Sequence, residues 1–171
     1  MSAPLLRTER TILIPLSIDD LDEAGALYGD DAVMEFVDGG VRTRDQTKSA
    51  LAAAERCWRS EGWGLWAIRD ATTGGLVGEA GLQHLFEVDG ATVDFGVTIA
   101  RRFWGEGHAT EAGHVILMDA WERYSGDLLH AVTHPDNVRS ANVLHKLGFR
   151  LAEERLIHGD TQNLWEIQRT R

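Results

Sequence analysis

The stretch RRFWGEGHATEA, residues 101–112, carries the residue types best suited to binding an anion. Gly105 and Gly107 lie directly before a segment with strong helix propensity. The first backbone N–H groups of a helix have no internal partners and carry the positive end of its dipole. Glycines let a ligand approach those groups, and Arg102 adds a charged donor. The spacing predicts a site for a pyrophosphate, with a simple glycine turn as the alternative.

This loop differs from two common nucleotide-binding patterns. It lacks the Gly-x-x-x-x-Gly-Lys-Ser/Thr spacing of nucleoside triphosphatases, and it also lacks Gly-x-Gly-x-x-Gly. The strands predicted before it form a meander rather than a βαβ unit, which disfavours a dinucleotide fold. The identity of the anion must therefore come from other parts of the chain.

Two carboxylates are candidates for acid–base chemistry. Asp94 lies in the alternating run ATVDFGVTIA, residues 91–100, on the face opposite its apolar residues. Glu79 lies in the apolar run LVGEAGL. Either carboxylate could act as a general base if burial raises its pKa. The alternative for Asp94 is an ordinary solvent-facing strand residue. His84 and His134 have suitable intrinsic pKa values.

Hydrophobic periodicity places these residues in an α+β domain. The pattern predicts a mixed sheet with helices on its faces, and the absence of linkers and repeats favours one domain over residues 1–171. Period-two runs predict strands at 11–16, 64–70, 76–85, 91–100, 128–134, 149–156 and 161–168. Caps and helical spacing predict about four helices, at 17–28, 43–60, 107–124 and 137–147.

Two blocks of the chain resemble one known family. Arg102–Gly107 matches Arg/Gln-x-x-Gly-x-Gly/Ala, the acetyl-CoA pyrophosphate loop of GNAT-superfamily N-acetyltransferases. Asn137–Phe149 resembles the later helix of that superfamily and its Leu-Gly-Phe exit. The opening TERTILIPLSIDDLD and the strand LVGEAGL resemble the RimJ/RimL-type branch, named for ribosomal-protein N-terminal acetyltransferases. The resemblance covers essentially the whole chain.

The resemblance implies a GNAT fold whose mixed, mostly antiparallel sheet is splayed into a V. Acetyl-CoA would be the co-substrate, and it would lie between the strand ending at Ile99 and the strand Leu129–Thr133. No metal is expected. The implied cofactor-binding residues are Val97, Thr98, Ile99, Arg102, Phe103, Trp104, Gly105, Glu106, Gly107, His108, Ala109, Thr110, Asn137 and Ser140.

The resemblance also implies direct attack by a primary amine in a ternary complex. Asp94 is the first choice for the general base and Glu79 the second. Many family members carry a tyrosine acid four residues after the Ser140 position, where this chain has Leu144. Ser140 could donate to the leaving sulfur instead, or it could merely cap the first turn of its helix.

The acceptor remains undetermined by these residues. A protein N-terminus and a small amine are both compatible with the pattern. The loss of the tyrosine leaves a second class of function, a catalytically idle acyl-CoA-binding or sensing domain.

Composition and charge narrow the classes of partner. The net charge is −10, and such a surface repels phosphate backbones, which disfavours nucleic acid. No apolar run reaches the length of a membrane span, residues 1–10 lack a signal-peptide pattern, and Cys57 is the only cysteine. We therefore expect a cytoplasmic protein that binds no membrane. Exposed edge strands leave a homodimer as an alternative to a monomer.

Overall fold

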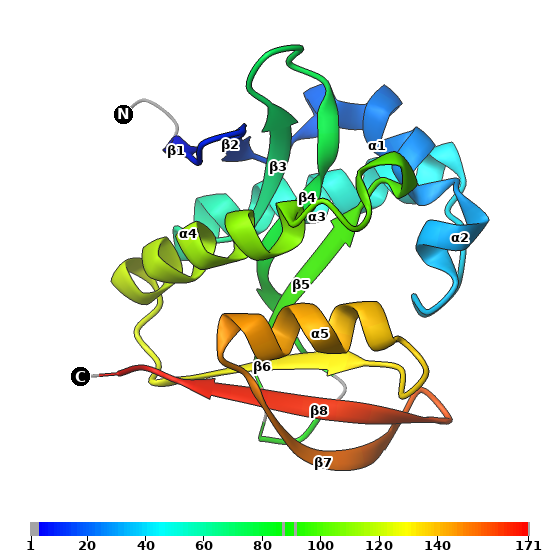
Figure 1. The fold of residues 1–171 in the computed structure, drawn as a ribbon. Coiled ribbons are helices and arrows are strands. Elements are labelled where there is room, and N and C mark those ends of the chain that lie inside the picture. Colours follow the sequence, from blue (N-terminus) through cyan, green and yellow to red (C-terminus); the bar gives the residue numbers. More distant parts are fainter. Residues whose placement is uncertain (1–3, 87, 91, 171) are drawn as a thin grey trace.

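One open sheet of eight strands forms the centre of the protein (Figure 1). The computed structural model describes residues 4–86, 88–90 and 92–170. The spatial order of the strands is β1-β2-β3-β4-β5-β6-β8-β7. The strands are β1 (Leu6–Arg7), β2 (Thr11–Pro15), β3 (Leu65–Asp70), β4 (Leu76–His84), β5 (Val93–Ile99), β6 (Leu128–Thr133), β7 (Arg150–Ile157) and β8 (Asp160–Gln168).

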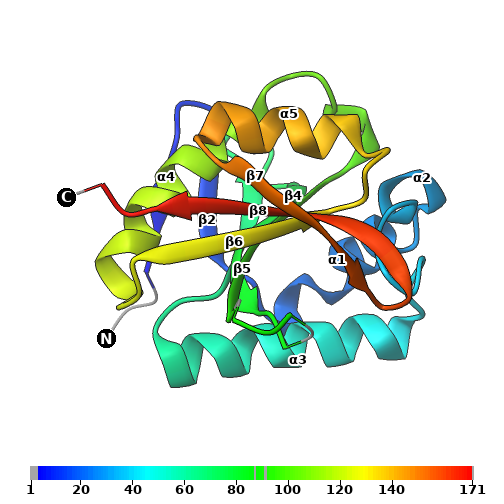
Figure 2. The same ribbon diagram turned by 90° about the horizontal axis from the view of Figure 1, so that it is seen from below.

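Helices cover both faces of the sheet, with α1 and α3 on one side and α4 and α5 on the other (Figure 2). The described helices are α1 (Leu21–Tyr28), α2 (Asp31–Met34), α3 (Arg44–Glu61), α4 (His108–Arg123) and α5 (Val138–Leu147), with short 3₁₀ turns η1 (Ile18–Asp20) and η2 (Arg101–Phe103). Among the described residues there are three apolar clusters: a small one at Val88, Ile157 and Leu164, and two larger ones that fill the layers. Leu51 packs with Ala67 on the α3 side, and Ile116 packs with Phe95 and Leu129 on the other.

Local sequence signals fix the ends of the helices. The predicted capping box of α3 is confirmed: the Thr43 hydroxyl accepts from the Gln46 N–H at 3.2 Å, and the Gln46 side chain accepts from the Thr43 N–H at 2.8 Å. Gly148 adopts the predicted left-handed cap after α5, with φ 95°. These positions follow from backbone chemistry, so the sequence predicts them well.

The sheet opens between β5 and β6. These two strands are parallel. Among the described residues they pair at one position, where Asp94 lies opposite His130. All other neighbouring strands are antiparallel and pair over their lengths. Beyond Asp94 the two strands diverge towards Ile99 and Thr133 (Figure 1). The expected single-domain α+β fold with a splayed, mostly antiparallel sheet is confirmed.

Two elements were not predicted, and both are too short for periodicity to show. Strand β1 has two residues and helix α2 has a single turn. The sequence also left Pro15 as either an edge or a strand-end residue. It is the last residue of β2, which lies between β1 and β3, so the strand-end interpretation is correct.

Candidate functional site

A cleft of about 300 Å³ lies at the end of β5, between the start of α4 and α5. The end of β5, the loop before α4, the first residues of α4, one side of α5 and the segment around α2 form its walls. The lining residues are Ala32, Val33, Phe36, Val37, Val97, Thr98, Ile99, Phe103, Trp104, Gly105, Gly107, His108, Ala109, Thr110, Asn137, Arg139, Ser140, Asn142, Val143 and Lys146. Most of the predicted cofactor residues are therefore brought together.

The loop before α4 has the backbone that an anion nest needs. Gly105 and Gly107 have φ of 76° and 81°, a left-handed region that favours glycine. Gly107 is the N-cap of α4, and no side chain caps this helix. The first N–H groups of α4 are thus available to ligand oxygens at the positive end of the helix dipole. The donor set fits a phosphate.

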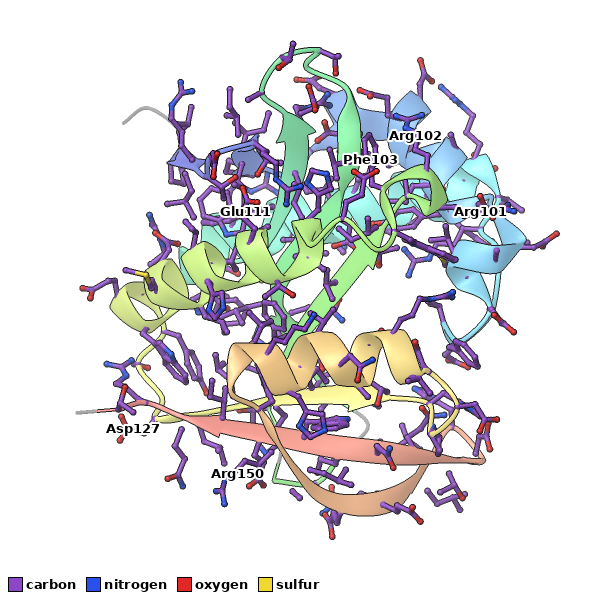
Figure 3. All side chains as sticks on the ribbon, in the orientation of Figure 1. Arg101, Arg102, Phe103, Glu111, Asp127 and Arg150 are labelled. Carbon is purple, nitrogen blue, oxygen red and sulfur yellow. The ribbon has the colours of Figure 1, made fainter. Side chains whose placement is uncertain are left out.

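Contacts from elsewhere in the chain hold this loop in place. Arg10 donates from Nη1 to the carbonyl oxygen of Glu106 at 2.8 Å and pairs with Glu111 on α4 at 2.6 Å. The Trp104 indole donates to the carbonyl oxygen of Ile99 at 2.7 Å. Figure 3 shows Glu111 directed from α4 towards β1 and β2. The loop is therefore anchored to both the N-terminal strands and the end of β5.

Two predicted cofactor residues do not line the cleft. Arg102 directs its guanidinium towards the carbonyl of Leu76, 3.5 Å away, and over the ring of Phe103. In Figure 3 it lies beside the α1–α2 segment, on the other side of the loop from α5. The Glu106 carboxylate is outside the cleft and contacts His108 Nε2 at 3.2 Å. The sequence could not show these directions, because they depend on neighbouring elements.

Helix α5 presents Asn137 and Ser140 to the cleft. The Asn137 side chain accepts from the Ser140 N–H at 3.2 Å and so caps the helix. This cap uses the Ser140 backbone and not its hydroxyl. Leu144 occupies the position where the resemblance led us to look for a tyrosine acid. It is 3% exposed and packs in the core.

Glu79 is a buried carboxylate beside the cleft. It is 7% exposed, and its cross-strand neighbour Thr98 lines the cleft. Burial raises the pKa of Glu79 above its usual value near 4.5, and the negative charge of Asp94 adds to this shift. The hydroxyls of Thr98 and Tyr28 and the charge of Arg42 oppose it. Among the described residues, Oε2 has no hydrogen-bond partner.

Tyr28 and Arg42 complete the surroundings of Glu79, and neither was predicted as a site residue. The Arg42 guanidinium lies 4.5 Å from the centroid of the Tyr28 ring. Burial, followed by the charge of Glu79, raises the pKa of Tyr28 well above 10. The two residues come from α1 and from the segment before α3, so only the fold brings them to β4.

Asp94 is also buried, at 7% exposed, which shows that the solvent-facing interpretation is wrong. Its Oδ2 accepts from the Gln83 amide at 2.9 Å, and its register partner across the splay is His130. Strand alternation puts it on the same face as Thr98 and Glu79, four residues before Thr98. Asp94 does not line the cleft, whereas the cross-strand neighbour of Glu79 does.

The cleft also contains residues that the sequence did not single out. Phe36 stacks on His134 with ring centroids 5.2 Å apart, which joins the α2 segment to the loop after β6. Arg139 lies over the Trp104 ring, 3.7 Å from its centroid. Arg139 falls inside the Asn137–Phe149 block, so its sequence position was a usable signal.

Comparison with known proteins decides the family. A family model described as the acetyltransferase (GNAT) domain matches residues 10–150. The chain belongs to the GNAT acetyltransferase family. It is an N-acetyltransferase, and enzymes of this family use acetyl-CoA.

Individual relatives agree with this GNAT assignment. The uncharacterised protein YkkB of Bacillus subtilis (strain 168) is 27% identical over 139 residues, which are 80% of each chain. The acetyltransferase of Agrobacterium tumefaciens str. C58 has a TM-score of 0.85 at 24% identity, over 99% of this chain and 96% of that one. RimL, a ribosomal L7/L12 alpha-N-protein acetyltransferase solved with coenzyme A, has a TM-score of 0.80 at 14% identity, over 96% and 98%. These two structures show the shared GNAT fold.

The described ranges of this GNAT enzyme contain neither a metal-binding cluster nor a membrane-spanning helix. Among residues 4–86, 88–90 and 92–170, no group of three or more His, Cys, Asp or Glu side chains is arranged to hold a metal ion. Within the same ranges, no helix has both the length and the apolar character needed to cross a membrane.

Proposed function

We propose that this enzyme transfers the acetyl group of acetyl-CoA to a primary amine by direct attack in a ternary complex. The observation that carries the proposal is the continuity of the cleft. It joins the end of β5 to the uncapped N-terminus of α4 and its two left-handed glycines, with α5 along one wall. An acyl carrier with a pyrophosphate matches this shape and these donors.

On the donor side, the α4 N–H groups and Gly105–Gly107 would hold the pyrophosphate. Acetyl-CoA supplies the activated thioester. The end of β5 from Val97 to Ile99 offers backbone groups to the arm of the donor, and Asn137 lies on the facing wall. The Ile99 carbonyl accepts from Trp104, so the indole fixes the direction of that strand end. These residues orient the thioester in a fixed position for attack.

Glu79 is our choice for the general base, ahead of Asp94. Burial raises its pKa, which makes its carboxylate a stronger base than an exposed glutamate. Thr98 stands between it and the cleft, so the proton of the amine would reach Glu79 through the Thr98 hydroxyl or one water. Asp94 would act indirectly, because its negative charge helps to raise the pKa of Glu79.

Ser140 is our choice for the group that serves the leaving sulfur. It lines the cleft, and its hydroxyl is not used to cap α5. The O–H would donate a hydrogen bond to the sulfur as the thiolate forms, and this interaction stabilises the developing charge. Leu144, one turn later, is apolar and buried in the core, so it cannot supply a proton.

For the acceptor, we infer a primary amine on a protein N-terminus or a small molecule. The α2 wall of the cleft is apolar, with Val33, Phe36 and Val37, so the group attached to the amine would pack against it. The RimJ/RimL-type opening of the sequence supports a protein N-terminus. The fold is compatible with either acceptor.

The test is acetyl-CoA turnover measured by thiol release, with an amine panel that includes N-terminal peptides and small amines. We expect release that depends on the amine and a labelled product by mass spectrometry. Tight CoA binding without thiol release for every amine would instead support the idle acyl-CoA-binding domain.

A further inference from the structure

Helix α5 carries a second positively charged wall of the cleft, opposite the glycine loop. Arg139, Asn142 and Lys146 follow one another at spacings of three and four residues, so they share one face of α5. All three line the cleft. Lys146 is one of only two lysines in the chain, the other being Lys48 on α3.

The charge of the cleft is opposite to that of the protein. The chain has 27 acidic residues and a net charge of −10, yet the residues lining the cleft include no Asp or Glu. Within residues 4–86, 88–90 and 92–170, no carboxylate oxygen lies within 4.0 Å of a side-chain nitrogen of Arg139 or Lys146. Neither residue therefore forms an ion pair there. The two cations are therefore not there to balance acidic neighbours.

The position of Arg139 is electrostatically unfavourable for the helix itself. It lies in the first turn of α5, where the dipole disfavours a cation, and that turn holds no acidic residue. The Arg139 guanidinium lies 3.7 Å from the centroid of the Trp104 ring, and both residues line the cleft. A cation kept at this cost to local helix stability indicates a ligand with negative charge at the α5 wall.

We propose that Arg139 and Lys146 bind the 3′-phosphate of the nucleotide end of coenzyme A. The inference rests on the proposed function, which assigns the pyrophosphate to the α4 wall. The phosphate that remains on the nucleotide is the one on the ribose 3′ oxygen. Charge-assisted hydrogen bonds to a phosphate are strong, so these two residues give the enzyme selectivity for CoA over 3′-dephospho-CoA.

Calorimetry with CoA and with 3′-dephospho-CoA, at one pH and one ionic strength, tests this proposal. We expect the wild-type protein to bind CoA about 10- to 100-fold more tightly, and raised salt to reduce that ratio. The double variant Arg139→Gln/Lys146→Gln should bind both ligands with nearly equal affinity. Its affinity for dephospho-CoA, within about threefold of wild type, shows that the variant is folded.

The matched control is the double variant Arg59→Gln/Lys48→Gln, which removes the same two charges from α3 outside the cleft. It should keep the wild-type preference. Arg139→Lys should keep part of the preference for CoA over 3′-dephospho-CoA. It retains the positive charge but loses the planar guanidinium, which can donate two parallel hydrogen bonds to a phosphate.

Three results would overturn the proposal. They are equal wild-type affinity for both ligands, an α5 double variant that keeps the preference, and an α5 double variant that weakens both ligands equally. In each of these results CoA still binds, so the proposed function stands. A wild-type protein that binds neither ligand would overturn the proposed function as well.

Discussion

The two sides of the cleft are built in different ways. The donor side, formed by the loop before α4 and by α5, uses backbone N–H groups, glycines and two cations, and no acidic residue lines it. On the proposed acceptor side, β4, α1 and the segment before α3 lie behind the cleft-lining residue Thr98, and they place one buried carboxylate, Glu79, beside Tyr28 and Arg42. The anion-binding part of the donor side is a single loop and the helix end that follows it. The acceptor side, in contrast, forms only where segments that are distant in the sequence meet.

This contrast explains how each side should respond to mutation. The donor side depends on backbone conformation, so a bulky residue should block binding. The acceptor side depends on the protonation state of the Glu79 carboxylate. Replacing this carboxylate with an amide of the same shape should therefore lower kcat and leave CoA binding unchanged. The predictions below test this separation from the largest expected effect to the smallest.

Gly107→Trp should remove donor binding almost completely. The residue has φ 81°, so any side chain would strain the loop, and a Cβ there would lie 3.7 Å from Arg10 Nη2, so a bulky ring should also disturb the Arg10 contacts that anchor the loop. We expect at least a ~100-fold loss of CoA affinity by calorimetry. Gly159→Trp is the control, because Gly159 has the same φ of 81° in the β7–β8 turn with open space around it. Retained affinity in Gly107→Trp would contradict the anion-nest assignment.

Glu79→Gln should lower kcat by about 100- to 1,000-fold, with CoA affinity unchanged, because the amide cannot accept the proton of the amine. Asp94→Asn is the comparison. It removes a neighbouring charge that raises the pKa of Glu79, so its effect on kcat should be below about tenfold. Steady-state kinetics over a pH series measure both. A larger loss in Asp94→Asn than in Glu79→Gln would reverse the assignment of the base.

Ser140→Ala should lower kcat by about tenfold, the scale of one neutral hydrogen bond to the leaving sulfur. The helix should remain intact, because Asn137 caps it through the Ser140 backbone. Circular dichroism and thiol-release kinetics provide the measurement. Unchanged kcat with a slow chemical step would show that the hydroxyl has no part in the transfer.

The smallest effect concerns stability against pH. The folded-state pKa of Glu79 is raised, so the stability from its buried neutral form is complete below the unfolded value near 4.5 and is lost as pH rises through the folded pKa. Glu79→Gln does not titrate. Its free energy of unfolding relative to wild type should therefore increase with pH across this window in urea titrations. A flat difference for Glu79→Gln would mean that the pKa of Glu79 is not raised.

The sequence was most successful where a local rule acts. The strand over residues 93–99, the capping box of α3 and the left-handed Gly148 were all predicted and are all present. The family resemblance implied most of the cleft-lining residues, since the loop and the α5 block that carry it are continuous stretches. Local rules gave the wrong environment for Asp94, because alternation identifies a face but does not say what covers it.

By itself, the sequence determined the donor loop of this protein. Two glycines before a helix permit left-handed backbone and offer no side chain to cap the N–H groups, and both are properties of a few consecutive residues. Only the tertiary structure decided the rest of the site. It turned Arg102 away from the cleft, brought Arg139 over Trp104, and surrounded Glu79 with groups from α1 and from the segment before α3. The burial of a side chain and its distance to other charges depend on all the segments that pack around it, so no single stretch of sequence specifies them.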